Sequence, residues 1–157
     1  MDASLAKRIL IVEDQKEKSQ AIRECLAEAV PKLKLEETNT IVIAGHLLAT
    51  EYGWRGVVLD LSFSRTQQSG NQIARPFLAG LEILQQLNEM RSEVPVIVAT
   101  QHSSFFSTRY GDFETIDQLR RMLVKAFPSN FKELIEVDLA GVKWRRALIK
   151  ASRNHFQ

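Results

Sequence analysis

The stretch GVVLDLSF, residues 56–63, decides the fold that we expect for this chain. Large aliphatic residues run without interruption into a single aspartate, and polar sequence follows soon afterwards. Such an apolar run is typical of a strand that is covered on both faces, as in a parallel sheet. Open α/β sheets place their ligands and chemistry outside the carboxyl ends of the strands. Asp60 is therefore a nucleophile, a metal ligand, or simply an acid that ends the strand and caps the next turn.

Strand and helix patterns alternate along the rest of the chain. Further strand patterns cover residues 7–12, 33–37, 94–100 and 131–138. Apolar residues at helical spacing follow each strand, within residues 22–30, 41–52, 80–87, 116–127 and 144–151. Five strands and five helices in alternation predict an α/β fold, with a doubly wound five-stranded parallel sheet and helices on both faces. We expect a single domain over residues 1–157, without a separate output domain.

Two local details of this pattern can be checked. Asp112 or Thr115 would cap the helix that follows residues 101–113. The last helix would bury a stripe formed by Trp144, Ala147, Leu148 and Ala151.

The composition is that of an ordinary globular protein, with 45% hydrophobic and 25% charged residues in a chain of 157. No apolar run approaches the roughly 20 residues that span a bilayer, and the N-terminus lacks the pattern of a secretory signal. Cys25 is the only cysteine, so an intrachain disulfide is excluded. It falls on the apolar face of its helix, which predicts a core thiol. We expect a cytoplasmic protein.

The net charge of +2 is unevenly spread. After Gly141 the chain carries no acid, and its basic residues are Lys143, Arg145, Arg146, Lys150 and Arg153. A basic terminal helix can meet phosphate backbones or an acidic partner. A solvated helix face explains the same pattern, and we do not expect nucleic-acid binding. Val142 and Ile149 lie beside this basic face, which suits a partner protein or a homodimer contact, or else two tolerated surface residues.

Polar residues end several of the predicted strands. Glu13 and Asp14 follow the first strand, Asp60 the third, and Thr100 ends the fourth. Because the carboxyl ends of parallel strands meet at one edge, these carboxylates would repel one another unless a cation or a proton relieves them. Oxygen ligands suit a hard ion such as Mg²⁺. A carboxylate beside Mg²⁺ can attack phosphorus and form an aspartyl phosphate, and the Thr100 hydroxyl could donate to a phosphoryl oxygen.

Four motifs in this order resemble the receiver domains of bacterial two-component response regulators. They are ILIVED at residues 9–14, VVLDL at 57–61, GLEIL at 80–84 and PVIVAT at 95–100. The resemblance covers most of the chain. It implies the flavodoxin-like strand order 2-1-3-4-5.

The resemblance also implies roles for individual residues. Asp60 would accept the phosphoryl group, and Thr100 would be the switch hydroxyl that contacts it. Asp14 would ligate Mg²⁺ directly and Glu13 through metal-bound water, while Asp60 and the backbone carbonyl of Ser62 would complete the protein ligands. The phosphoryl donor would be a histidine kinase, a phosphotransfer protein or a small acyl phosphate.

The chain also departs from the family pattern. Receiver domains carry a lysine, usually followed by proline, at the end of the fifth strand, where this chain has Glu136, Val137 and Asp138. An acid there would repel phosphate. The aromatic switch residue is replaced by Leu134 or Ile135, and Gln101 follows the switch hydroxyl. The loops at residues 62–76 and 101–113, both longer than usual in the family, flank the expected site.

Two functional interpretations remain open from the sequence. In the first, a stand-alone receiver is phosphorylated on Asp60, and the added charge reshapes the face formed by the last two helices and the fifth strand. In the second, an atypical receiver-like module binds partners without phosphorylation. A third interpretation is a phosphatase of the haloacid-dehalogenase type. It would require a second aspartate where this chain has Ser62, so we do not expect an enzyme.

Overall fold

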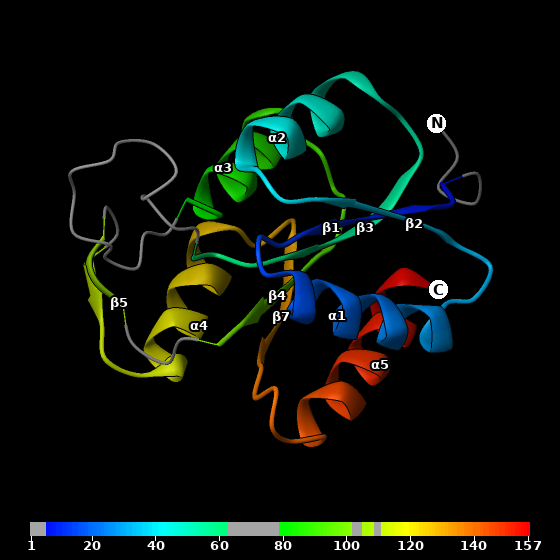
Figure 1. The fold of residues 1–157 in the computed structure, drawn as a ribbon. Helices are drawn as coiled ribbons and strands as arrows, with labels where there is room; N and C mark the ends of the chain where they lie inside the picture. Colours follow the sequence, from blue (N-terminus) through cyan, green and yellow to red (C-terminus); the bar gives the residue numbers. More distant parts are fainter. Residues whose placement is uncertain (1–5, 63–78, 102–104, 109–110) are drawn as a thin grey trace, which may run out of the picture.

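A computed structural model describes residues 6–62, 79–101, 105–108 and 111–157 (Figure 1). Its main element is a five-stranded parallel sheet in the order β2-β1-β3-β4-β7. The sheet strands are β1 (Arg8–Val12), β2 (Lys34–Thr38), β3 (Trp54–Leu59), β4 (Val96–Thr100) and β7 (Phe131–Glu136). In chain order this arrangement is 2-1-3-4-5, as the family resemblance predicted.

Helices cover both faces of the sheet (Figure 1). They are α1 (Lys16–Ala29), α2 (Ile41–Thr50), α3 (Leu81–Glu89), α4 (Ile116–Ala126) and α5 (Lys143–Phe156). Side chains of α2, α3 and α4 share one apolar cluster with one face of the strands. Side chains of α1 and α5 form the second cluster with the opposite face. The predicted doubly wound α/β fold is therefore confirmed.

The central strands are buried because both of their faces carry aliphatic side chains. Val57 and Leu59 point into the first cluster, and Val58 points into the second. All three have exposed fractions of 1% or less. This is the outcome expected for a continuous apolar run in a parallel sheet.

A two-stranded antiparallel hairpin adds to the predicted elements. It consists of β5 (Phe105–Thr108) and β6 (Gly111–Phe113), between β4 and α4. The sequence pattern predicts only a long loop over residues 101–113, so the predicted number of strands is too low. A hairpin of this length carries too few residues for a clear alternating pattern, and only its pairing identifies it.

Two details of the helices resolve or correct the sequence-based expectations. Thr115, rather than Asp112, caps α4, since its hydroxyl accepts a hydrogen bond from the Gln118 amide at 3.2 Å. Ala147 is exposed, although the last helix was predicted to bury it. The buried stripe of α5 is rotated toward Ser152 and Phe156.

The expected core position of the Cys25 thiol is confirmed. Cys25 is buried among the residues of the second cluster. No helix in the described part of the chain is long and apolar enough to cross a membrane.

Candidate functional site at the carboxyl edge of the sheet

The strand register brings the predicted site residues to one edge. Val12 lies opposite Leu59 in the β1–β3 ladder, so the residues that follow them, Glu13 and Asp60, leave the sheet at the same level. The Asp60 amide continues the ladder by donating to the Val12 carbonyl at 3.0 Å. Thr100 is the last residue of β4, next to β3 in the sheet, and its side chain is fully buried.

The predicted acidic cluster is present. Glu13, Asp14 and Asp60 each offer a carboxylate oxygen, and these oxygens all lie within 4.8 Å of one another. Glu13 and Asp60 are buried, with exposed fractions of 3% and 6%, while Asp14 is partly exposed. Asp14 also borders an open cleft of about 570 Å³, which gives this side of the cluster access to solvent.

Ser62 lies close to the Asp60 carboxylate. Its backbone amide donates to Asp60 Oδ1 at 3.3 Å, and its buried hydroxyl has no hydrogen-bond partner among the described residues. The role predicted for its backbone carbonyl as a metal ligand stays a prediction.

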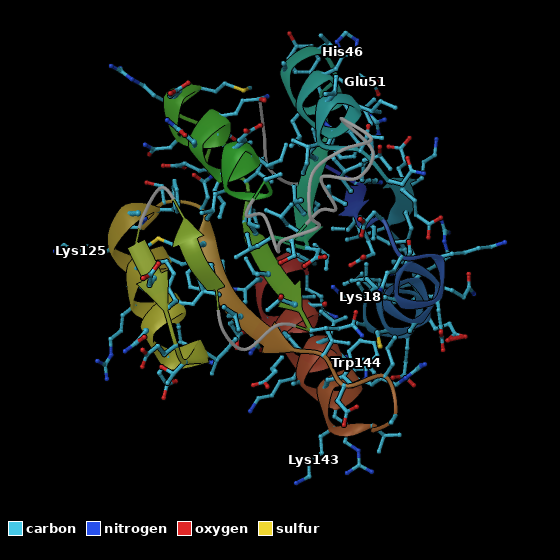
Figure 2. All side chains as sticks on the ribbon, turned by 60° about the vertical axis from the view of Figure 1, so that its left-hand side comes forward. Lys18, His46, Glu51, Lys125, Lys143 and Trp144 are labelled. Atoms are coloured by element: carbon cyan, nitrogen blue, oxygen red, sulfur yellow. The ribbon has the colours of Figure 1, made fainter. Side chains whose placement is uncertain are left out.

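A lysine for which the sequence predicts no role lies within this cluster. Lys18, from the first turn of α1, has an exposed fraction of 1%. Its ammonium lies 2.6 Å from Glu13 Oε1 and 3.4 Å from Asp60 Oδ1, and it donates a hydrogen bond to the Ala99 carbonyl at 2.8 Å. Figure 2 shows Lys18 on the side of α1 that faces the sheet.

The sequence does contain a signal for Lys18, although a weak one. The buried stripe of α1 runs through Ile22, Cys25, Leu26 and Ala29, and Lys18 lies four residues before Ile22 on the same face. A lysine that extends an apolar stripe is usually explained by its aliphatic stem, with the charge reaching water. Here the stripe leads to the carboxylates, so the charge stays inside.

Burial dominates the electrostatics of the site. Loss of water around Glu13, together with the nearby charge of Asp60, raises the pKa of Glu13 from 4.5 to about 7, against the opposing effect of Lys18. Burial likewise raises the pKa of Asp60, which Lys18 and the Ser62 amide partly offset. One ammonium faces three carboxylates, so the cluster still favours a proton or a further cation.

The raised pKa of Glu13 predicts how stability depends on pH in metal-free buffer. The folded protein holds the Glu13 proton up to about pH 7, whereas the unfolded chain releases it near 4.5. The folded state therefore binds more protons between these values, and the free energy of unfolding should fall as pH rises through this window, by up to about 3 kcal/mol. Urea titrations at several pH values in EDTA measure this slope.

Two glutamine variants test whether Glu13 causes this pH dependence of the free energy of unfolding. Glu13→Gln should lose this component of the pH dependence, while Glu17→Gln, which removes an exposed carboxylate of α1, should follow the wild type. Parallel curves for the wild type and Glu13→Gln across the window would show that Glu13 titrates normally.

The donor set at this edge fits a hard divalent cation. All three acidic residues present oxygen, which Mg²⁺ prefers. Glu13 Oε1 is buried and makes no hydrogen bond among the described residues, so its contact is the ion pair with Lys18. Glu13, Asp14 and Asp60 are the residues that would hold the ion.

Other basic residues near the fifth strand of the sheet do not reach the cluster. Lys132 is exposed at the start of β7, and Lys143 is exposed as the first residue of α5 (Figure 2). His102 and most of residues 62–76 lie outside the described residues, and His46 is exposed on α2.

Comparison with known proteins supports a receiver-type fold. No protein-family model matches the chain. The Detocs response regulatory protein DtcB of Enterobacter cloacae is 22% identical over 146 residues, which cover 91% of this chain and 96% of DtcB. An uncharacterized protein, y4jR of Sinorhizobium fredii, is 25% identical over 147 residues, covering 92% of this chain and 95% of y4jR.

Solved receiver structures share the fold at low sequence identity. The phosphorylated cyanobacterial phytochrome response regulator RcpA matches with a TM-score of 0.61 and 14% identity, covering 95% of this chain and 93% of RcpA. The Mn²⁺-bound form of the response regulator Rcp1 matches with a TM-score of 0.61 and 16% identity, covering 96% of this chain and 95% of Rcp1. A receiver domain from Rhodospirillum rubrum matches with a TM-score of 0.62 and 15% identity, over 94% of this chain and 92% of that domain.

Proposed function

We propose that this protein, which has the fold of response-regulator receiver domains, accepts a phosphoryl group on Asp60 in the presence of Mg²⁺ and transmits the change through protein contacts. The observation that carries the proposal is the convergence of three carboxylates at one sheet edge, where the hydroxyl-bearing Thr100 ends the neighbouring strand β4. An acid that only capped the end of a strand would not require two further carboxylates and a hydroxyl beside it.

The geometry around Asp60 suits a nucleophilic carboxylate. Among the described residues, the polar contacts of this carboxylate fall on Oδ1, from the Ser62 amide and Lys18. We assign attack on phosphorus to Oδ2. With acetyl phosphate as donor, a bond forms between Oδ2 and phosphorus, the bond from phosphorus to the acetate oxygen breaks, and acetate leaves with the electron pair.

Several groups would stabilise the transferred phosphoryl group. A bound divalent cation neutralises charge on the phosphoryl oxygens, and Glu13, Asp14 and Asp60 would hold it. The Thr100 hydroxyl would donate to one phosphoryl oxygen. This is stoichiometric acceptor chemistry, so we expect no turnover of a separate substrate and do not class the protein as an enzyme.

The expected setting is cytoplasmic phosphorelay signalling. The donor would be a histidine kinase or a phosphotransfer protein. The output would be a downstream protein that binds the face formed by α4, β7 and α5. Thr100 lies next to Glu136 in the β4–β7 ladder, so a change at Thr100 has a direct structural route to this face.

Acetyl phosphate provides the first test of this function. Incubation with Mg²⁺ should add one phosphoryl group to the intact protein, measured by mass spectrometry. Asp60→Ala should abolish the gain, because no nucleophile remains at the site. Asp117→Ala, which removes an exposed aspartate of α4, should leave the gain unchanged.

Chelation of Mg²⁺ with EDTA should also suppress the modification of the wild type. Absence of modification by acetyl phosphate and by a phosphohistidine donor, together with absence of Mg²⁺ binding, would contradict the proposal. That result would favour the second interpretation, a receiver-like module that binds its partners without phosphorylation.

A further inference from the structure

Glu136, Val137 and Asp138 stand where receiver domains carry a lysine, and only Val137 among them has a buried side chain. Val137 follows β7 and donates its amide to the Thr100 carbonyl at 2.8 Å, so it lies directly beside the switch position. Its side chain is buried in the cluster formed with α1 and α5. The neighbouring Glu136 and Asp138 are exposed acids. Residues 136–138, at the carboxyl end of β7, therefore offer no cation to a phosphoryl group on Asp60.

Lys18 reaches the same region from α1. Both Lys18 and Val137 lie on the side of the sheet that α1 and α5 cover. The Lys18 ammonium donates a hydrogen bond to the carbonyl of Ala99, the residue before Thr100. The same ammonium also lies beside the Asp60 carboxylate. The positive charge thus lies between the ends of β3 and β4, although it comes from a helix near the beginning of the chain.

The Lys18 ammonium lies closer to two of its oxygen neighbours than to the third. An ammonium has three N–H donors, and here three oxygens surround it: Glu13 Oε1, Ala99 O and Asp60 Oδ1. The first two lie at 2.6 and 2.8 Å, while Asp60 Oδ1 lies at 3.4 Å. The contact with Asp60 is the longest, so it is the one most readily exchanged for a phosphoryl oxygen.

We propose that Lys18 replaces the lysine that receiver domains carry at the end of their fifth sheet strand, which is β7 in this chain. Lys18 pairs with Glu13 and Asp60 in the resting site, and it contacts a phosphoryl oxygen once Asp60 is modified. This inference rests on the function proposed above. It assigns the role of phosphate-binding cation to a residue of α1, whereas the family pattern assigns it to the strand.

The position of Lys18 has opposite consequences for the two ligands of the site. Its ammonium lies against Glu13 Oε1, one of the oxygens available to a divalent cation, and repels that cation. The same ammonium attracts the phosphoryl group. Removing the charge should therefore strengthen Mg²⁺ binding and weaken phosphorylation. Loss of folding would lower both, so the opposite signs separate a site role from a structural one.

The test compares Lys18→Gln with the wild type and with Lys150→Met, which removes an exposed charge of α5. Calorimetry should show Mg²⁺ binding about tenfold tighter in Lys18→Gln, because a like charge has left the site. The initial rate of phosphoryl incorporation from acetyl phosphate at saturating Mg²⁺ should fall about 100-fold, the scale for losing one such donor. Lys150→Met should match the wild type in both measurements.

A second variant combines Lys18→Gln with Val137→Lys and so places a lysine at the end of β7. It should recover at least a tenth of the wild-type rate, and it provides the measurement if Lys18→Gln alone does not fold. Equal rates of phosphoryl incorporation for the wild type and Lys18→Gln would overturn the role of Lys18. So would a folded double variant that is as slow as Lys18→Gln. Both results would leave the proposed function intact. A wild type that accepts no phosphoryl group at all would overturn both.

Discussion

Replacing Gly80 by alanine is expected to lower the free energy of unfolding by about 3 kcal/mol, because the added methyl group has no room. A Cβ at this position would lie 2.3 Å from the Asp60 carbonyl oxygen and 2.7 Å from Leu61 Cα. These are backbone atoms, so no side chain can rotate away. The Gly80 amide also donates to the Leu61 carbonyl at 3.0 Å, which locks α3 against the end of β3.

The effect of Gly80→Ala arises from contact and not from backbone conformation. Gly80 has φ −60 and ψ −24, values that alanine adopts readily. The substitution should also slow the proposed phosphorylation of Asp60, because displacement of a reacting group by about 1 Å can cost roughly 100-fold in rate. Urea denaturation measures the first effect, and the acetyl phosphate assay measures the second.

Gly45→Ala is the matched control for this variant. Its Cβ would approach the end of the Gln86 side chain at 2.7 Å, and that side chain can move. Alanine is also favoured over glycine within a helix by about 1 kcal/mol. We expect the stability of Gly45→Ala to stay within about 1 kcal/mol of the wild type. If Gly80→Ala proves equally mild, the close packing of α3 on the Asp60 backbone is not a constraint.

Phe156→Ala is the second substitution with a large expected effect, a loss of about 3–5 kcal/mol in the free energy of unfolding. Phe156 is the last residue of α5, and its ring is fully buried. The ring lies over Gly56 of β3, where a Cβ would come within 2.2 Å of it. The C-terminal end of the chain therefore closes the α1–α5 side of the core.

A double-mutant cycle can test this packing directly. Gly56→Ala should destabilise the protein because the new methyl group meets the Phe156 ring. In the Phe156→Ala background that clash is gone, so the two losses should sum to clearly more than the loss in the double variant. Tyr52→Ala controls for the removal of an aromatic ring, since Tyr52 is 76% exposed and should change stability by less than about 0.5 kcal/mol. Strict additivity of the two losses would contradict the proposed contact.

Much of the candidate site could be predicted because it follows from strand direction. Glu13 and Asp60 directly follow aliphatic strands, and Thr100 ends one. In a parallel sheet such residues emerge at one edge whatever the details of packing. The acidic cluster that the structure contains is the one that the sequence predicted.

The missing parts of the prediction depend on which segments contact one another. The β5–β6 hairpin is defined by the pairing of its two strands, and local periodicity over so few residues does not reveal it. The exposure of Ala147 depends on how α5 is rotated against the sheet. Each of these features is settled by a neighbour that a local sequence pattern does not contain.

The sequence by itself determined the doubly wound parallel sheet and the acids at its carboxyl edge, because alternating apolar patterns specify both the elements and the direction in which they end. Only the tertiary structure decided what balances those acids. Lys18 meets Asp60 and Ala99 because α1, which packs against β1, β2 and α5, turns the buried face of its first turn toward the ends of β3 and β4. The carboxyl end of β7 carries no lysine, and the packing of α1 places Lys18 beside the Asp60 carboxylate.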